Sequence, residues 1–275
     1  MIIASDLDRT LVYSKRAIEQ LGLPKETSLR SVEVKDGNPI AFMTETAYHA
    51  LVELCRNCLF IPVTTRTTAQ YKRFTIFGDS ISLPYAITFN GAMILYKGEP
   101  LMDWSQHILS KIQRESARLD ELQAGLKRGG FHFNGRLKSA ENLFFYYLLE
   151  SSPSLSEVQS LSSTVSKYGW RVSLQGRKLY LIPNAINKGA ALEYICSREG
   201  SPALAGAGDS ILDWDFLMNC QNRFVPAHGE LAQFGPKKGV TYTERAGILA
   251  GEEIMQQFLT ILEHSFKNKE VNTSK

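Results

Sequence analysis

Short apolar runs rich in β-branched residues alternate with helical patterns along most of this chain, and this alternation restricts the fold more than any other feature. Runs of this kind, bounded by turn or helix signals, are typical of strands buried on both faces. Strands that alternate with helices predict an α/β fold with a mostly parallel sheet and helices on both faces. The strands are expected within 1–7, 58–65, 85–94, 202–209, 222–227 and 239–243, and the helices within 44–57, 187–200 and 243–266.

The middle of the chain has a different pattern. One amphipathic pattern from Asp103 to Gly129 and a second from Ser154 to Tyr168 are each followed by two apolar segments. The order helix, two strands, helix, two strands predicts a small α+β domain inserted into the sheet domain. The expected strands of the insert lie within 131–139, 142–150, 170–176 and 177–183. The expected divisions are a discontinuous core at 1–94 plus 185–268, the insert at 95–184, a flexible tail at 269–275, and a hairpin at 31–43 that turns at Asp36-Gly37.

Composition excludes several classes of protein. The 275 residues carry a net charge of +3 and 44% of them are apolar, so the chain can bury enough surface to fold. Lys and Arg form no run of five or six, and nothing indicates a nucleic-acid partner. Four cysteines are too few for a disulfide framework. The start has no leader pattern and no apolar run approaches about 18 residues, so we expect a cytoplasmic protein without a membrane partner. The sequence gives no indication of its oligomeric state.

The first expected strand ends in Asp6-Leu7-Asp8-Arg9-Thr10, with two carboxylates separated by one residue. Side chains two apart on a strand point to the same side, so both carboxylates face one small volume. Such carboxylates repel each other unless one is protonated or a cation compensates them. Asp and Thr are also common in the turn after a strand, and this pattern alone leaves both interpretations open.

Ligands of open α/β sheets bind at the carboxyl ends of the strands, so the polar residues after the other runs are candidates for a site. Thr64, Thr65 and Arg66 follow the second run, Asn90 and Gly91 end the third, and Lys188 precedes a helix. A hydroxyl, backbone N–H groups and a guanidinium suit a phosphate oxygen. Each group also has an ordinary interpretation: a helix cap for the threonines, a tight turn for Asn-Gly and a solvated side chain for the lysine.

A second pair of carboxylates, Asp209 and Asp213, follows the fourth run, after small residues that permit close backbone approach. Ligand sets made only of oxygen are those that Mg²⁺ prefers, and it usually binds one or two carboxylates together with phosphate. The five histidines are dispersed and show no zinc-ligand spacing. We therefore expect Mg²⁺ as the cofactor.

Taken in order, the segments DLDRT, VTTR, NKGAAL and GDSILD resemble the four motifs of the haloacid dehalogenase-like superfamily of phosphatases. The long insert between the second and third motifs, and the NGA at 90–92, are similar to the Cof-type and sucrose-phosphatase-like branch, whose members carry a C2 cap. The resemblance spans nearly the whole chain. It implies a Rossmann-like core with an inserted α+β C2 cap, and a Mg²⁺-dependent phosphoric monoester hydrolase.

Carried over position by position, the resemblance gives each motif residue a role. Asp6 matches the nucleophile that forms an aspartyl-phosphate, and Asp8 matches the general acid and base, whose backbone carbonyl also faces the metal. Thr64 matches the hydroxyl that holds the phosphate, and Lys188 matches the cation that offsets the charge of the nucleophile and the phosphate. The resemblance gives four metal-binding residues, namely Asp6, Asp8, Asp209 and Asp213. The second acid of the first motif favours a phosphatase over the dehalogenase branch, which lacks it.

In C2-capped relatives the cap closes over the leaving group and supplies specificity, so the resemblance implies a small phosphorylated metabolite such as a sugar phosphate as substrate. The candidate substrate contacts are Thr65, Arg66, Asn90 and Gly91 from the core, and Lys138 and Arg177, with Arg136, Asn142 and Lys178, from the cap. Three positions depart from the residues usual in the motifs: Arg9, Thr65 and Leu212.

Two alternatives remain beside the phosphatase. A phosphomutase or phosphotransferase on the same fold would return the phosphoryl group to a substrate instead of to water. A non-catalytic protein that binds a metabolite would keep the fold without turnover, an alternative motivated by Thr65 and Leu212. Intact charged residues argue against this second alternative, namely Asp6, Asp8, Lys188 and Asp209.

Overall fold

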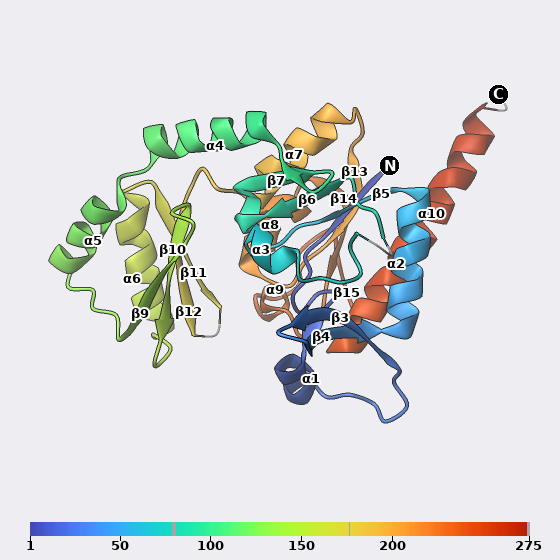
Figure 1. The fold of residues 1–275 in the computed structure, drawn as a ribbon, viewed down its shortest axis with the longest axis horizontal. Helices are drawn as coiled ribbons and strands as arrows, with labels where there is room; N and C mark the ends of the chain where they lie inside the picture. Colours follow the sequence, from blue (N-terminus) through green and yellow to red (C-terminus); the bar gives the residue numbers. More distant parts are fainter. Residues whose placement is uncertain (79–80, 176, 274–275) are drawn as a thin grey trace. The chain divides into compact units, whose positions relative to one another are not determined.

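The structure, a computed structural model, describes residues 1–78, 81–175 and 177–273, with side chains described as far as residue 267 (Figure 1). The chain divides into two compact units, one of Met1–Pro100 with Lys188–Lys275 and the other of Leu101–Asn187. Residue 176 of the strand expected at 170–176, and residues 274–275 of the expected tail, lie outside the described residues.

A five-stranded parallel sheet forms the centre of the first unit, in the order β15-β14-β13-β1-β5. Its strands are β1 (Ile2–Ser5), β5 (Leu59–Pro62), β13 (Ala203–Ala207), β14 (Cys220–Val225) and β15 (Val240–Tyr242). The last residue of β1, Ser5, pairs in register with Pro62 on one side and with Ala207 on the other. The residues that follow these three strands therefore meet at one edge of the sheet. This arrangement confirms the predicted α/β fold with a parallel sheet.

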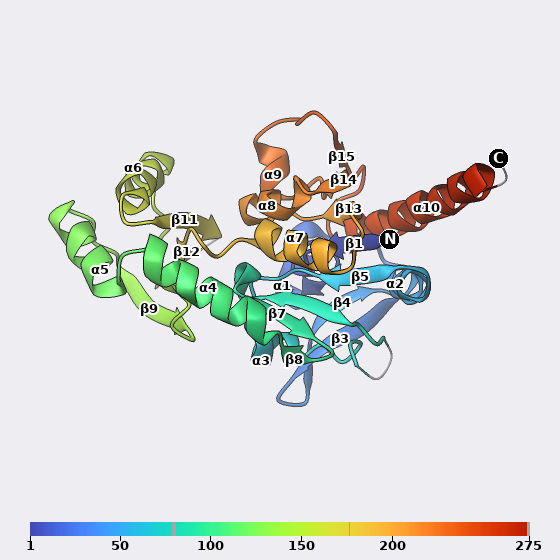
Figure 2. The same ribbon diagram turned by 90° about the horizontal axis from the view of Figure 1, so that it is seen from above.

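Helices cover both faces of this sheet. They include α2 (Glu45–Asn57), α7 (Lys188–Arg198), α8 (Trp214–Leu217) and α10 (Ile248–Thr273). On one face, Ala205 and Ala207 join an apolar cluster with side chains of α2 and α10, two helices that lie side by side in Figure 2. On the other face, Gly206 meets Phe216 of α8, and a Cβ at Gly206 would lie 2.5 Å from the sulfur of Cys220. The absence of a side chain at Gly206 thus lets α8 pack closely on the sheet.

Two helix ends follow their sequence signals. The Thr44 side chain accepts a hydrogen bond from the backbone N–H of Ala47 and caps the start of α2. Helix α7 ends at Arg198, and Gly200 has a φ of 58°, the left-handed conformation expected at C′. The N–H groups of Gly200 and Ser201 then bond to carbonyls of the last turn, which satisfies groups that the helix end would leave unpaired.

The segment after β1, which contains the hairpin expected at 31–43, forms a small antiparallel sheet in the order β2-β4-β3. Its strands are β2 (Tyr13–Ser14), β3 (Leu29–Lys35) and β4 (Asn38–Thr44), and α1 (Lys15–Leu21) follows β2. The predicted turn is confirmed: Asp36 and Gly37 have φ values of 51° and 75°, as a two-residue hairpin turn of this hand requires.

The strand expected at 85–94 is not continuous. It consists of β6 (Tyr85–Thr88), a 3₁₀ turn η1 (Phe89–Gly91) and β7 (Met93–Tyr96), which returns antiparallel to β6 and pairs with β8 (Glu99–Pro100). Phe89 and Asn90 both have positive φ, 51° and 58°, and this reverses the chain. Two shorter helices of this unit are α3 (Thr68–Tyr71) and α9 (Glu230–Gln233).

The second unit is a four-stranded antiparallel sheet with helices packed on one face. Its strands run in the order β11-β12-β10-β9, and its elements are α4 (Met102–Glu115), α5 (Leu119–Arg128), β9 (Gly135–Ala140), β10 (Phe144–Leu149), α6 (Leu155–Ser166), β11 (Trp170–Gln175) and β12 (Lys178–Pro183). Along β10, Phe145 and Tyr147 pack into the apolar cluster with α5 and α6. The aromatic run at 144–147 therefore contributes to the core of this unit.

The amphipathic pattern at 103–129 forms two helices instead of one. The chain leaves the helix at Ser116, and the N–H of Ala117 donates to the carbonyl of Tyr168. Gly169, the residue after Tyr168, lies so close to the end of this helix that a Cβ there would be 2.0 Å from the carbonyl oxygen of Glu115. This contact between distant segments ends the helix, although the apolar periodicity continues through the break.

Helix α10 continues into the tail expected at 269–275: the backbone of its first five residues is helical, as far as Thr273. Over the residues that the structure describes, none of the helices combines the length and the apolar character that crossing a bilayer requires.

Candidate active site

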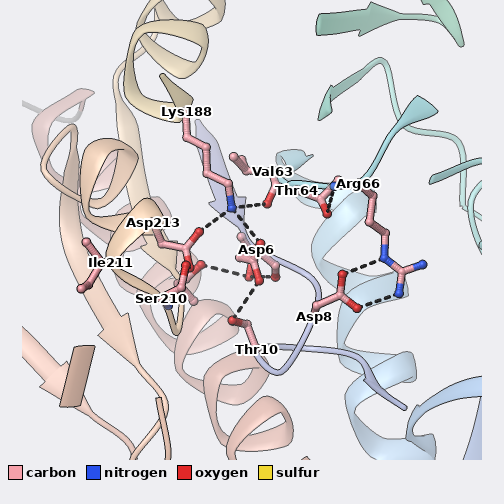
Figure 3. A network of polar contacts seen from close by, with 12 residues as sticks. Asp6, Asp8, Thr10, Val63, Thr64, Arg66, Lys188, Ser210, Ile211 and Asp213 are labelled. Carbon is pink, nitrogen blue, oxygen red and sulfur yellow. Dashed lines mark hydrogen bonds and ion pairs between the residues drawn. The ribbon is translucent and has the colours of Figure 1, made fainter. Parts of the chain in front are cut away.

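Asp6 follows β1 directly and lies at the edge of the sheet where β1, β5 and β13 end (Figure 3). Its backbone N–H donates to the carbonyl of Ala207, which continues the pairing of β1 with β13 by one residue. The residue Asp6 is 5% exposed, and the hydroxyl of Thr10 donates to its Oδ2 over 3.4 Å. The first carboxylate of the motif is thus fixed at the sheet edge by backbone pairing.

Lys188, the first residue of α7, places its ammonium group among the carboxylates. Its Nζ donates to Asp6 Oδ1 over 2.9 Å, to Asp213 Oδ1 over 2.5 Å and to the carbonyl of Val63 over 3.4 Å (Figure 3). The side chain is fully buried. The solvated-lysine interpretation of the sequence is therefore wrong, because the ammonium is held by two carboxylates inside the protein.

Asp209 and Asp213 bring the fourth motif to the same place. Asp213 lies in the 3₁₀ turn η2 (Ile211–Asp213), and its Oδ2 accepts hydrogen bonds of 2.8 Å from both the N–H and the hydroxyl of Ser210. Carboxylate oxygens of Asp6, Asp209 and Asp213 all lie within 4.8 Å of one another. Gly208 makes this approach possible, because a Cβ there would lie 2.4 Å from the Cβ of Asp213.

The electrostatics of this cluster show an excess of negative charge. Burial, reinforced by Asp213, raises the pKa of Asp6 from 3.8 to about 8, although Lys188 acts in the opposite direction. Burial, with Asp213 and Asp6, also raises the pKa of Asp209 well above its usual value. Burial lowers the pKa of Lys188, but the two carboxylates outweigh it and the net shift is upward. One ammonium does not balance three carboxylates, so the site favours a further cation.

Arg9 occupies a strained position in the loop after Asp6. Its φ is 63°, a conformation that glycine adopts more readily than a residue with a side chain. The loop is held by His228, whose Nε2 lies 2.9 Å from the Arg9 carbonyl oxygen and whose Nδ1 accepts from the N–H of Gly247. The half-exposed Arg9 guanidinium reaches Asp209 at 3.8 Å. This departure from the motif therefore adds a partial counter-charge at the rim of the cluster.

The second motif follows β5. Thr64 is fully buried, its carbonyl accepts from the N–H of Asn90, and its hydroxyl accepts from the N–H of Arg66 over 3.2 Å. Thr65, between them, is half-buried. Leu212, the departure in the fourth motif, is 2% exposed and packs as an apolar side chain. Thr64 directly follows Val63, whose carbonyl accepts a hydrogen bond from Lys188.

Asn90 combines two unusual properties. It is fully buried with a positive φ, and within the described part of the chain neither its side-chain oxygen nor its nitrogen has a hydrogen-bond partner. Buried amides are normally satisfied, so an unpaired one calls for an explanation. Its backbone bond to Thr64, and the packing of η1 against α7, place it next to the second and third motifs. Gly91 completes this turn.

Asp8 does not join the three clustered carboxylates. Its two oxygens accept hydrogen bonds from the guanidinium of Arg66, 2.7 Å from Nε to Oδ2 and 2.6 Å from Nη2 to Oδ1 (Figure 3). Arg66 in turn forms an ion pair of 2.7 Å with the buried Glu33 of β3, which also pairs with Arg73. Glu33 and Arg73 were not among the residues predicted from the sequence.

The candidates from the insert lie in the second unit. Lys138 is an exposed residue of β9, and Arg177 is an exposed turn residue before β12 whose carbonyl accepts from the N–H of Leu149. Of the other candidates in this unit, Arg136 lies on β9, Asn142 in the turn before β10, and Lys178 at the start of β12.

No protein-family model and no curated protein matches this sequence. Solved structures do match. Sucrose-phosphatase from Synechocystis, solved in complex with sucrose and phosphate, is similar with a TM-score of 0.67 and 17% identity, over 94% of this chain and 97% of that one. A trehalose-6-phosphate phosphatase related protein matches with a TM-score of 0.53 and 17% identity, over 98% and 100%. A haloacid dehalogenase-like hydrolase from Bacillus subtilis matches with a TM-score of 0.52 and 13% identity, over 94% and 91%.

This chain has the haloacid dehalogenase-like fold. The matches cover nearly the full length of this chain and of each neighbour, so the likeness includes the second unit as well as the parallel sheet. The resemblance inferred from the four motifs is confirmed at the level of the fold.

Proposed function

We propose that this protein is a phosphatase that hydrolyses a phosphoric monoester through an aspartyl-phosphate on Asp6, with Mg²⁺ as cofactor. One observation carries the proposal: Asp6 is buried at the carboxyl edge of a parallel sheet, bonded to the ammonium of Lys188 and within 4.8 Å of two further carboxylates. A buried carboxylate beside a cation and an incompletely neutralised acidic cluster is suited to attack on an anionic phosphoryl group.

The donor set fits Mg²⁺. Asp6, Asp209 and Asp213 offer only oxygen, and burial together with the neighbouring carboxylates raises the pKa of Asp6 and of Asp209. We expect Asp6 and Asp209 to hold the ion with the backbone carbonyl of Asp8, and Asp213 to act near it while it orients Lys188. When bound, Mg²⁺ would neutralise the charge of the phosphoryl group and so ease nucleophilic attack.

The protein's own residues account for the other steps. A carboxylate oxygen of Asp6 attacks phosphorus, the bond to the leaving oxygen breaks, and Asp8 gives that oxygen a proton. Water then attacks the phosphorus of the aspartyl-phosphate, Asp8 takes a proton from the water, and phosphate leaves Asp6. Lys188 holds Asp6 in place and offsets its charge. The hydroxyl of Thr64 and the unpaired amide of Asn90 are suited to phosphate oxygens.

The substrate that we propose is a small phosphorylated metabolite, sugar-phosphate-like. The sucrose-phosphatase and the trehalose-6-phosphate phosphatase related protein that share this fold support a sugar phosphate. Selection of the leaving group by the cap predicted at 95–184, through Lys138 and Arg177, stays a prediction. So does a substrate contact by Thr65, Arg66 or Gly91.

The test is release of inorganic phosphate from a panel of phosphorylated metabolites, with and without Mg²⁺. We expect Mg²⁺-dependent turnover that is abolished in Asp6→Asn. Asp36→Asn is the matched control: the same change at the exposed hairpin turn, where asparagine tolerates the positive φ of 51°. Isomerised substrate without phosphate release would indicate a phosphomutase, and binding without turnover a non-catalytic protein. Either result would refute the proposal.

A further inference from the structure

Glu33 is a buried carboxylate that the proposed mechanism does not use. It lies on β3 and is 1% exposed. Its Oε1 accepts from Arg73 Nε over 2.9 Å and lies 2.8 Å from Arg73 Nη2 and 2.7 Å from Arg66 Nη1. A buried carboxylate is costly unless it is paired, and here two guanidinium groups compensate it.

Arg66 is the link between Glu33 and the active site. Its guanidinium lies over the ring of Phe74, 4.5 Å from the centroid; Nη1 forms an ion pair with Glu33 without hydrogen-bond geometry, and Nε and Nη2 donate to Asp8. Its backbone is fixed as well: the N–H bonds to the Thr64 hydroxyl and the carbonyl accepts from Phe89. Arg66 therefore presents two parallel N–H groups to Asp8 in a fixed direction.

Asp8 depends on this contact for its orientation. Its side chain is 47% exposed on the loop after β1, and among the described residues the donors to its carboxylate are those of Arg66. A half-exposed carboxylate without such a clamp samples several rotamers. A proton donor acts efficiently only within hydrogen-bond reach of the leaving oxygen. The position of Asp8 thus follows the position of the Arg66 guanidinium.

We propose that Glu33 is a positioning residue for Asp8, acting through Arg66. This inference rests on the proposed phosphatase activity, in which Asp8 is the acid and base. In the first step Asp8 is protonated: one oxygen keeps its bond to Arg66, and the other, released from Arg66, transfers its proton to the leaving oxygen. In the second step the same oxygen takes a proton from the attacking water. Glu33 touches none of the reacting atoms and fixes the direction from which Asp8 acts.

The leaving group of the substrate provides a sharp test. An alkoxide leaving group needs a proton from Asp8, whereas a nitrophenolate is stable enough to leave without one. The measurement is kcat/KM, which reports the steps up to cleavage of the ester, for a series of phosphate monoesters from alkyl to nitrophenyl. The variants are Glu33→Gln and, as a matched control, Glu45→Gln. Glu45 forms an ion pair of 2.9 Å with Arg30, which lies on β3 as Glu33 does, and the substitution removes this partner of Arg30.

For Glu33→Gln we expect kcat/KM to fall at least about tenfold with alkyl phosphates and less than about threefold with nitrophenyl phosphates. Glu45→Gln should leave both values within about twofold of the wild type. An equal loss across the series, or no loss, would overturn the inference and leave Glu33 a structural ion-pair residue. A wild type that releases phosphate from none of the esters would instead overturn the proposed function, and this inference with it.

Arg66→Lys provides a second, independent variant if Glu33→Gln fails to fold. Lysine keeps the positive charge but cannot donate two parallel hydrogen bonds to Asp8 while it contacts Glu33. We expect the same dependence on the leaving group. A uniform rise in KM with unchanged kcat for every ester would contradict the inference, because it would mean that Arg66 binds the substrate phosphate and does not orient Asp8.

Discussion

Removal of the Asp6 charge should stabilise this protein when no divalent cation is bound. Asp6 is 5% exposed and shares a small volume with Asp209 and Asp213, and within the described part of the chain Lys188 is the one cation buried among them. Functional sites often keep charges together at a cost in stability. Asp6→Asn keeps the shape of the side chain and removes one negative charge, so it isolates this electrostatic cost.

The magnitude follows from the pKa of Asp6, which burial and Asp213 raise from 3.8 to about 8. Between these two pH values the folded chain binds this proton and the unfolded chain does not, so the free energy of unfolding falls as pH rises through the window. Across these four pH units the free energy of unfolding falls by on the order of 5 kcal/mol, and the full loss is present above pH 8. Asparagine also loses the charged bond to Lys188, and we expect a net gain of about 1–3 kcal/mol at pH 8.

The assay is urea unfolding in the presence of a chelator at pH 5 and pH 8, for the wild type, Asp6→Asn and the control Asp36→Asn. The gain in Asp6→Asn should be larger at pH 8 than at pH 5, because Asp6 is protonated in the folded chain at the lower pH. Added Mg²⁺ should stabilise the wild type more than Asp6→Asn. Parallel stability curves for the wild type and Asp6→Asn across this pH range would mean that the Asp6 charge does not destabilise the folded chain.

Three further predictions concern other residues of the site. Gly208→Ala places a Cβ 2.4 Å from the Cβ of Asp213, so it should lower the free energy of unfolding by about 1–3 kcal/mol in urea titrations and reduce turnover. Lys188→Met should reduce kcat for phosphate release at least about 100-fold, since it removes a buried cation bonded to Asp6, the proposed nucleophile. Asn90→Gly keeps the positive φ and removes the unpaired amide; it should raise KM several-fold in steady-state assays and change the stability by less than about 1 kcal/mol.

Local signals in the sequence account for much of the sheet domain. The apolar runs become β1, β5, β13, β14 and β15, because short β-branched segments between helices are buried on both faces of a parallel sheet. Thr44 and the Asp36-Gly37 turn are local as well, since each depends on its own backbone geometry and a few neighbours. The site residues at the strand ends could be proposed from the same order of strands.

Features that depend on contacts between distant segments could not be predicted. The break between α4 and α5 is imposed by Gly169, which lies beside Glu115 only in the folded chain. Glu33 stands between two valines in a strand, and irregular pairing on either side of it obscures which face it occupies. Its pairing with Arg66 and Arg73 crosses 33 and 40 residues of chain. No local pattern indicates such a network.

A phosphoryl group carried by Asp6 can be trapped chemically. The protein is incubated with Mg²⁺ and its best phosphorylated substrate, quenched, treated with borohydride and analysed by peptide mass spectrometry, since borohydride reduces an acyl phosphate to an alcohol. We expect Asp6 to be converted to homoserine only when substrate and Mg²⁺ are both present. Reduction at another residue, or an unmodified Asp6 in a protein that is turning over substrate, would contradict this expectation.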